Sequence, residues 1–156
     1  MTRFLAKLID WALLGIVISI VWFAIFLGVV FSAVSTGRGL GSFLVNLLGA
    51  IVITAIVVGY FAFMESSRGQ TVGKMLLKLE VRGPNGGKPT MEEAVKRNAY
   101  NAIYVLNVIP FIGWLLGSLG LLAANIYIAI GINNDTVNRR GWHDQFAGNT
   151  TVYKIG

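Results

Sequence analysis

Residues 11–37 read WALLGIVISIVWFAIFLGVVFSAVSTG, a run without a charged side chain. About 20 apolar residues cross the hydrocarbon core of a bilayer, so this run is long enough to span a membrane. Residues 39–64 form a second uncharged run, and residues 98–134 form a third that Pro110 interrupts. The third run is too long for one crossing, and we interpret it as a tight hairpin of two short helices. The sequence therefore predicts an all-α membrane protein with four transmembrane helices.

The basic residues are distributed unevenly around the four predicted helices. With the N-terminus in the cytoplasm, twelve of the thirteen lysines and arginines lie on the cytoplasmic side, and Arg38 alone lies outside. A single crossing by the third run would change this to nine against four. Cytoplasmic loops retain Lys and Arg, so the count favours the hairpin and places both termini in the cytoplasm. We expect a multi-pass protein of the cell inner (plasma) membrane.

Composition excludes several classes of function. The chain has no cysteine and a single histidine, His143, which removes thiolate metal sites, disulfides and multi-histidine metal or haem sites. We expect no cofactor and no metal. The formal net charge of +6 is explained by basic loops beside the membrane, so we expect membrane lipids rather than nucleic acid as partners. The chain also lacks the nucleophile or acid–base pair that would indicate an enzyme.

One domain, residues 1–156, is expected for a chain of this length. Small residues mark one face of its last predicted helix, and we expect close packing there within the chain in preference to a seam between two copies. These residues are Gly113, Gly117 and Gly120.

The predicted spans cover residues 5–34, 43–64, 92–109 and 112–132, with a cytoplasmic connector at 65–90 and a cytoplasmic tail at 133–156.

The connector carries further signals of secondary structure. Residues 69–77 (GQTVGKMLL) indicate a short turn or helix, and residues 77–82 alternate apolar and charged side chains, which is typical of a strand. Residues 150–155 alternate in the same way, and we predict that the two strands pair, because a lone strand is marginally stable. Thr90 and Glu93 have the spacing of a capping box before the third helix. The fold therefore includes a small cytoplasmic two-stranded β element.

Asp10 is an ionisable residue inside the first predicted helix. A charge within a membrane helix is costly and indicates a functional site. Arg3 lies seven residues earlier, about two helical turns away and on nearly the same face. Asp10 is also close to the membrane interface, where it can pair with Lys7 or a connector cation in a purely structural way. Both interpretations, a structural ion pair and a part in transport, are open at this point.

Four blocks of the sequence resemble the RDD family, a group of small, mainly bacterial membrane proteins named for one arginine and two aspartates. The resemblance implies that Arg3, Asp10 and Asp144 are the three residues of the name. Asn149 is a departure, because family members usually continue directly from glycine to threonine, and it leaves the register of the last strand open. The blocks are Arg3-x-x-Ala6-x-x-Ile9-Asp10, Gly69-Gln-Thr71-Val-Gly73-Lys74, Ala94-x-x-Arg97-Asn98 and Arg140-Gly-Trp-His143-Asp144-x-x-Ala147-Gly148.

We hypothesise that Arg3 is held between Asp10 and Asp144, because a planar guanidinium can serve two carboxylates at once. Such a bridge either holds the tail permanently against the first helix, or acts as a gate that opens when a carboxylate is protonated or binds a cation. Glu65 is expected to pair with Arg68 or Lys74. The supporting residues around the cluster are Arg97, His143, Glu65, Gly69, Thr71, Gly73 and Lys74.

The resemblance implies a transport-related function, with monovalent cation/proton antiport suggested for some members and accessory roles for others. One hypothesis is cation/proton exchange through membrane-embedded carboxylates. The alternative is a non-transporting accessory or assembly subunit of a larger membrane complex. Four short helices enclose little space, so transport is expected to need a homo-oligomer or a larger complex. A wet cavity lined by Asp10 favours transport, whereas a dry interior with Asp10 locked to Arg3 favours the accessory role.

Overall fold

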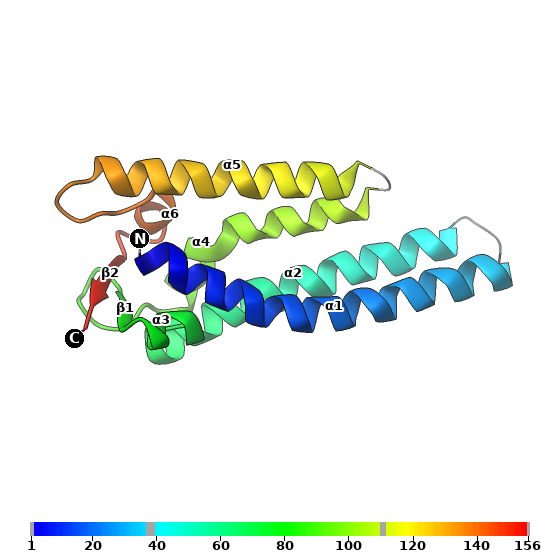
Figure 1. The fold of residues 1–156 in the computed structure, drawn as a ribbon, viewed down its shortest axis with the longest axis horizontal. Coiled ribbons are helices and arrows are strands. Elements are labelled where there is room, and N and C mark those ends of the chain that lie inside the picture. Colours follow the sequence, from blue (N-terminus) through cyan, green and yellow to red (C-terminus); the bar gives the residue numbers. More distant parts are fainter. Residues whose placement is uncertain (1, 37–39, 110–111, 156) are drawn as a thin grey trace.

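A computed structural model describes residues 2–36, 40–109 and 112–155, and these are mostly helical. The long helices lie side by side, and the sheet and the shortest helices gather at one end of the bundle (Figure 1). In chain order the elements are α1 (Thr2–Thr36), α2 (Leu40–Arg68), α3 (Val72–Leu76), β1 (Leu79–Arg82), α4 (Met91–Asn98), the 3-10 helix η1 (Ala99–Val108), α5 (Gly113–Asn134), α6 (Trp142–Phe146) and β2 (Thr151–Lys154).

Within the described residues, three helices are long and apolar enough to cross a membrane, namely Thr2–Ser35, Gly41–Arg68 and Leu115–Asn134. Large apolar side chains point outward along α1, where Phe23 is 64% and Phe31 is 74% exposed. A continuous apolar surface of this kind is unfavourable in water and is matched by lipid. The chain is therefore a membrane protein with several apolar helices.

The predicted span at residues 92–109 is not one α-helix. Its first part is α4, and the chain then continues as η1, a 3-10 helix. A 3-10 helix rises about 2.0 Å per residue against about 1.5 Å for an α-helix, so the 8 residues of α4 and 10 of η1 extend about 32 Å. This nearly matches the length of α5, about 33 Å for its 22 residues. The predicted turn at Pro110 lies outside the described residues.

Helix η1 lies between α2 and α5 and packs against both (Figure 1). The glycines on α5 face it, as the sequence predicted: a Cβ at Gly113 would lie 2.1 Å from the carbonyl oxygen of Leu106, and one at Gly120 would lie 3.2 Å from Ile103. Small residues thus allow α5 to approach η1 closely. The expectation of close packing within the chain is confirmed.

Helices α1 and α2 meet through an apolar core. Leu14 and Ile25 of α1 pack with Ile53, Val57 and Phe61 of α2 in a buried cluster. This core occupies the part of the bundle away from the sheet. The end that carries the first turns of α1, together with α3, α6, β1 and β2, is called the charged end below.

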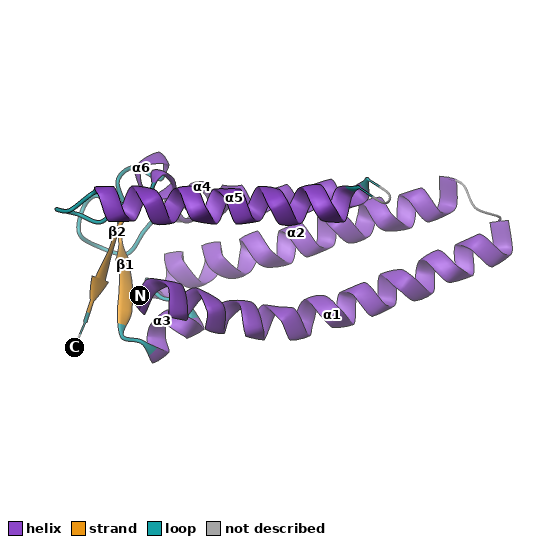
Figure 2. Ribbon diagram, turned by 45° about the horizontal axis from the view of Figure 1, so that its top comes forward, coloured by secondary structure: helices purple, strands orange, loops and turns teal. Residues whose placement is uncertain are grey.

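The predicted strand pairing is confirmed. Strands β1 and β2 are antiparallel, with Leu79 opposite Lys154 and Arg82 opposite Thr151, and they lie beside the first turns of α1 (Figure 2). Each strand is shorter than the alternating run that predicted it. Asn149 adopts a left-handed conformation, with φ of 68°, and so turns the chain from α6 into β2. The extra residue therefore belongs to the turn and leaves the strand register intact.

The capping box at α4 is also confirmed. The Thr90 hydroxyl accepts the backbone N–H of Glu93 at 3.2 Å, and the Glu93 carboxylate accepts the backbone N–H of Thr90 at 2.8 Å. These bonds satisfy two of the free donors at the start of the helix. They fix the direction in which α4 enters the bundle and therefore the position of Arg97.

We expect Gly113→Ala to lower the thermal unfolding midpoint of the detergent-solubilised protein by several degrees. Its Cβ would overlap the Leu106 carbonyl and force α5 away from η1, at a cost of about 1–3 kcal/mol. Gly15→Ala on α1 is the matched control, because no atom lies within 4 Å of its Cβ position. The control is expected to leave the midpoint unchanged or slightly raised. Equal midpoints for both variants would contradict close α5–η1 packing.

Candidate functional site

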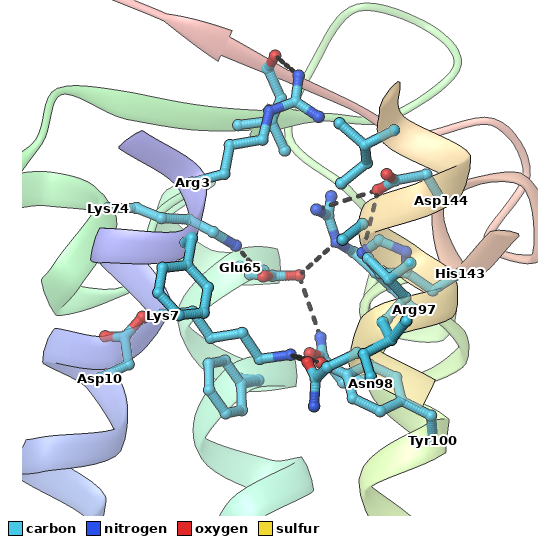
Figure 3. Close-up of a pocket in the computed structure, with 18 of the residues that line it drawn as sticks. Arg3, Lys7, Asp10, Glu65, Lys74, Arg97, Asn98, Tyr100, His143 and Asp144 are labelled. Carbon is cyan, nitrogen blue, oxygen red and sulfur yellow. Dashed lines mark hydrogen bonds and ion pairs between the residues drawn. The ribbon is translucent and has the colours of Figure 1, made fainter. Parts of the chain in front are cut away.

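A cavity of about 300 Å³ lies at the charged end, between the first turns of α1 and the second half of α5. Figure 3 shows its charged side chains, which come from α1, α2, α3, α4 and α6. Arg3, Asp10 and Asp144, which the sequence singled out, all line it. Among the described residues, the ionisable groups of the wall are the cations Arg3, Lys7, Lys74 and Arg97, the carboxylates Asp10, Glu65 and Asp144, the phenol of Tyr100, and His143.

Arg97 connects two carboxylates across the cavity. Its Nε lies 3.6 Å from Oε2 of Glu65, and its Nη2 lies 3.0 Å from Oδ1 of Asp144. Its Nη1 also donates to Oγ1 of Thr150 at 3.5 Å. Arg97 is only 4% exposed, so these contacts compensate a charge that water does not reach. The guanidinium that serves two carboxylates is therefore that of Arg97, on α4.

Glu65, on the last turn of α2, is the centre of this network in Figure 3. Its carboxylate accepts a hydrogen bond from Lys74 of α3 and one from the side-chain amide of Asn98 at 3.1 Å. The predicted pairing of Glu65 with Lys74 is confirmed. Because Lys74 and Arg97 approach the same carboxylate from opposite sides, Glu65 joins the connector to α4.

Asp144 is fixed at the start of α6. Its Oδ2 accepts the backbone N–H of Gly141 at 2.9 Å, and its Oδ1 accepts the Thr150 hydroxyl at 3.4 Å. Burial alone would raise the pKa of Asp144, but the Arg97 guanidinium and the Gly141 N–H hold that pKa below its ordinary value. Asp144 is therefore a permanent anion of the wall at neutral pH.

Asp10 is 1% exposed and is held by neutral groups. Its Oδ1 accepts the Tyr60 hydroxyl and the backbone N–H of Gly73, both at 2.8 Å, and its Oδ2 accepts the Thr71 hydroxyl at 2.5 Å. Among the described residues, no cationic nitrogen lies within 4.0 Å of this carboxylate. The predicted pairing of Asp10 with Lys7 or a connector cation is therefore wrong.

The loop residues predicted to support the cluster position the donors to Asp10. Gly69 ends α2 in a left-handed conformation with φ of 71°, and Thr71 caps α3. Gly73 lies against α1: a Cβ there would be 2.0 Å from the carbonyl oxygen of Ala6. The loop can therefore bring a backbone N–H to Asp10 only with glycine at position 73.

Arg3 does not bridge Asp10 and Asp144, so that prediction is wrong. Its Nη1 donates to the carbonyl oxygen of Arg139 at 2.5 Å, and its Nη2 donates to that of Val152 at 2.8 Å. Asp10 and Asp144 lie on opposite sides of the cavity, each with its own donors (Figure 3). Arg3 nevertheless connects the first helix to the tail, through two backbone carbonyls instead of two carboxylates.

The RDD family model matches residues 1–148 of the chain. The chain belongs to the RDD family. The three residues of the family name thus line one cavity of this RDD protein without forming a direct ion pair with one another. No curated protein and no solved structure matches the chain significantly.

Three polar residues of this RDD cavity, Lys7, Tyr100 and Asn125, were not among the predicted site residues. Nζ of Lys7 donates to the Tyr100 hydroxyl and to Oδ1 of Asn125 at 2.5 Å, and it lies 4.5 Å from the centre of the Tyr100 ring. Lys7 lies four residues after Arg3, so helical spacing places the two cations on one face. That spacing was the available signal, whereas the contacts to η1 and α5 depend on tertiary packing.

The polar groups of the cavity wall differ in charge and in the kind of partner they have. The described residues contain no group of three or more His, Cys, Asp or Glu side chains that could hold a metal ion. Burial lowers the pKa of His143 to about 3, so its ring is neutral at physiological pH. Among the described residues, the wall therefore offers fixed charges of both signs, the Tyr100 hydroxyl, and one carboxylate, that of Asp10, whose donors are all neutral.

We expect Arg97→Gln to destabilise the protein by about 3–5 kcal/mol, because it leaves Glu65 and Asp144 buried with less compensation. The measurement is the thermal or denaturant unfolding midpoint in detergent. Arg82→Gln is the matched control, since Arg82 pairs with Glu80 on the exposed sheet and such pairs contribute below about 1 kcal/mol. Similar losses in the two variants would argue against the central role of Arg97.

Stability is expected to fall as pH drops below 6.5. The folded protein keeps His143 neutral down to about pH 3, whereas the unfolded chain binds a proton below about 6.5. Burial of neutral His143 therefore has no pH-dependent effect on stability above pH 6.5. Below pH 6.5 it lowers the free energy of unfolding by at most about 1.4 kcal/mol per pH unit. Unfolding midpoints between pH 6.5 and 5 test this, and His143→Gln should flatten the slope. The contribution of Asp144 begins to be lost only below its ordinary pKa of 3.8, as the pH falls toward the lowered pKa of the folded state, and this lies outside the window.

Proposed function

We propose that this RDD protein is a transport-related protein of the plasma membrane that exchanges a monovalent cation for a proton at Asp10. The supporting observation is the difference between Asp10 and the other two carboxylates of the cavity. Glu65 and Asp144 are each paired with a cation, whereas Asp10 accepts only neutral donors among the described residues. A proton or a cation can therefore bind Asp10 without displacing a lysine or an arginine.

The chemistry at Asp10 supports exchange of one ion for the other. Carboxylate and hydroxyl oxygens are the ligands that hard cations prefer, and the hydroxyls of Thr71 and Tyr60 lie within 2.8 Å of this carboxylate. A proton bound to Asp10 removes the negative charge that attracts a cation. Because the two ligands compete for one group, release of one is coupled to binding of the other.

The proposed topology has four crossings, with both termini and the cavity on the cytoplasmic side. The two helices of the proposed hairpin are α4–η1 and α5, and η1 is covered by α2 and α5 on two sides. A buried position of this kind lets polar residues such as Asn101 enter the bundle. Orientation follows from the concentration of lysines and arginines at the charged end.

An accessory function is the second candidate, and the apolar core favours it. Beyond the cavity, Leu14, Ile53 and Val57 are buried in the apolar core between α1 and α2. An ion would have to pass this core, which requires a second conformation or another subunit. In a non-transporting subunit, Asp10 serves to attach the connector to α1 through Thr71 and Gly73.

Purified protein in liposomes with a pH-sensitive dye inside tests the exchange. An imposed gradient of Na⁺ or K⁺ is expected to drive proton flux above that of empty liposomes, and Asp10→Asn should abolish it because the amide cannot take up a proton. Glu92→Gln is the matched control, since Glu92 is an exposed carboxylate that pairs with Lys96. Both variants are compared at equal amounts of folded protein.

Absence of flux with the wild type, or unchanged flux in Asp10→Asn, would reject exchange at Asp10. Tyr60→Phe provides a second variant that keeps the carboxylate. It removes one of the three donors to Asp10, so we expect flux to persist, because the carboxylate can still bind a proton or a cation.

A further inference from the structure

The cavity holds more positive than negative charge. Among the described residues, its wall carries four cations and three carboxylates, and His143 is neutral. Lys74 and Arg97 are paired with Glu65 and Asp144. The positive excess therefore resides on α1, at Arg3 and Lys7, which lie one helical turn apart.

Neither of these two cations has a carboxylate partner. In the described part of the chain, no carboxylate oxygen lies within 4.0 Å of the Arg3 guanidinium or the Lys7 ammonium. Arg3 donates to two carbonyls, and Lys7 donates to a phenol and an amide. An ammonium has three N–H donors, and two acceptors among the described residues contact Lys7. A charge removed from water in this way is costly until an anion compensates it.

The rest of the wall is apolar and reaches the outer surface of the bundle. Phe4 of α1 is 66% exposed, and Leu122 and Ile126 of α5 are 58% and 51% exposed, yet all three line the same cavity as Lys7. The charged interior is therefore continuous with a surface suited to acyl chains. A ligand that matches both parts has one anionic group and a long apolar group.

We propose that this cavity binds an anionic phospholipid of the surrounding bilayer, with its phosphodiester at Lys7 and an acyl chain along Phe4, Leu122 and Ile126. Arg3, which points to the other end of the cavity (Figure 3), adds to the positive charge of the wall. A single negative charge balances the excess positive charge of the wall. Phosphate oxygens accept the N–H donors of an ammonium. This proposal concerns an anion at Lys7 and does not depend on cation exchange at Asp10.

Titration of the full-length protein in detergent with phosphatidylglycerol or phosphatidylcholine of identical acyl chains tests this site. Lipid retained by the protein is measured by native mass spectrometry, and the thermal unfolding midpoint is recorded alongside. Phosphatidylglycerol is expected to bind at least tenfold more tightly and to raise the midpoint. Lys7→Gln should remove that preference, whereas Lys7→Arg, which keeps the charge, should retain it. Lys78→Gln is the matched control, because Lys78 is exposed at the charged end and does not line the cavity.

Three results would overturn the proposal. Equal binding of the two lipids would show that the anionic headgroup is not recognised. An equal loss of preference in Lys7→Gln and Lys78→Gln would show a general effect of surface charge. Equal stabilisation by soluble glycerol phosphate would show that the anion is a free phosphate ester and not a lipid. If Lys7→Gln does not fold, Leu122→Asn on the apolar wall replaces it, and undiminished lipid binding by that variant also rejects the site.

Discussion

The pairing of Arg97 with Glu65 and Asp144 holds the charged end together, because three buried charges from three helices have to compensate one another. Glu65 fixes the end of α2 and, through Lys74, the position of α3. Asp144 fixes α6, from which the chain turns into β2. A shift of any one of these helices would leave a charge without a partner in an environment that water does not reach. The connector and tail are therefore parts of the bundle and not loose attachments to it.

The remaining charged residues on α1 are bound in a different way. Asp10 accepts neutral donors, Arg3 donates to carbonyls, and Lys7 donates to a phenol and an amide. Their charges are thus solvated by dipoles and are not cancelled by counter-ions. A charge that is surrounded by neutral dipoles still attracts a mobile ion of opposite sign. A charge that already has a counter-ion within the protein largely does not. The two proposals for this RDD protein, a cation at Asp10 and an anionic lipid at Lys7, both rest on that distinction.

Local patterns in the sequence predicted the local structure well. Alternating residues predicted the pairing of β1 with β2, spacing predicted the capping box at Thr90, and proximity predicted the contact between Glu65 and Lys74. Helical spacing correctly placed Arg3 and Asp10 on one face of α1. It could not determine the partners of these residues, because a long side chain can reach several acceptors and tertiary packing selects among them. The same limit explains why Arg97, and not Arg3, serves two carboxylates.

The 3-10 geometry of η1 was also beyond prediction, because an apolar run has no periodicity that separates it from an α-helix.

The order of residues along the chain has a consequence for biosynthesis. Arg97 is translated well before Asp144, so the ribosome delivers a guanidinium to the bilayer before one of its two counter-ions exists. Until α6 has been synthesised, Glu65 is the one of these two carboxylates that can pair with Arg97. Final closure of the bundle is thus a late event, completed after the hydrophobic segments have inserted.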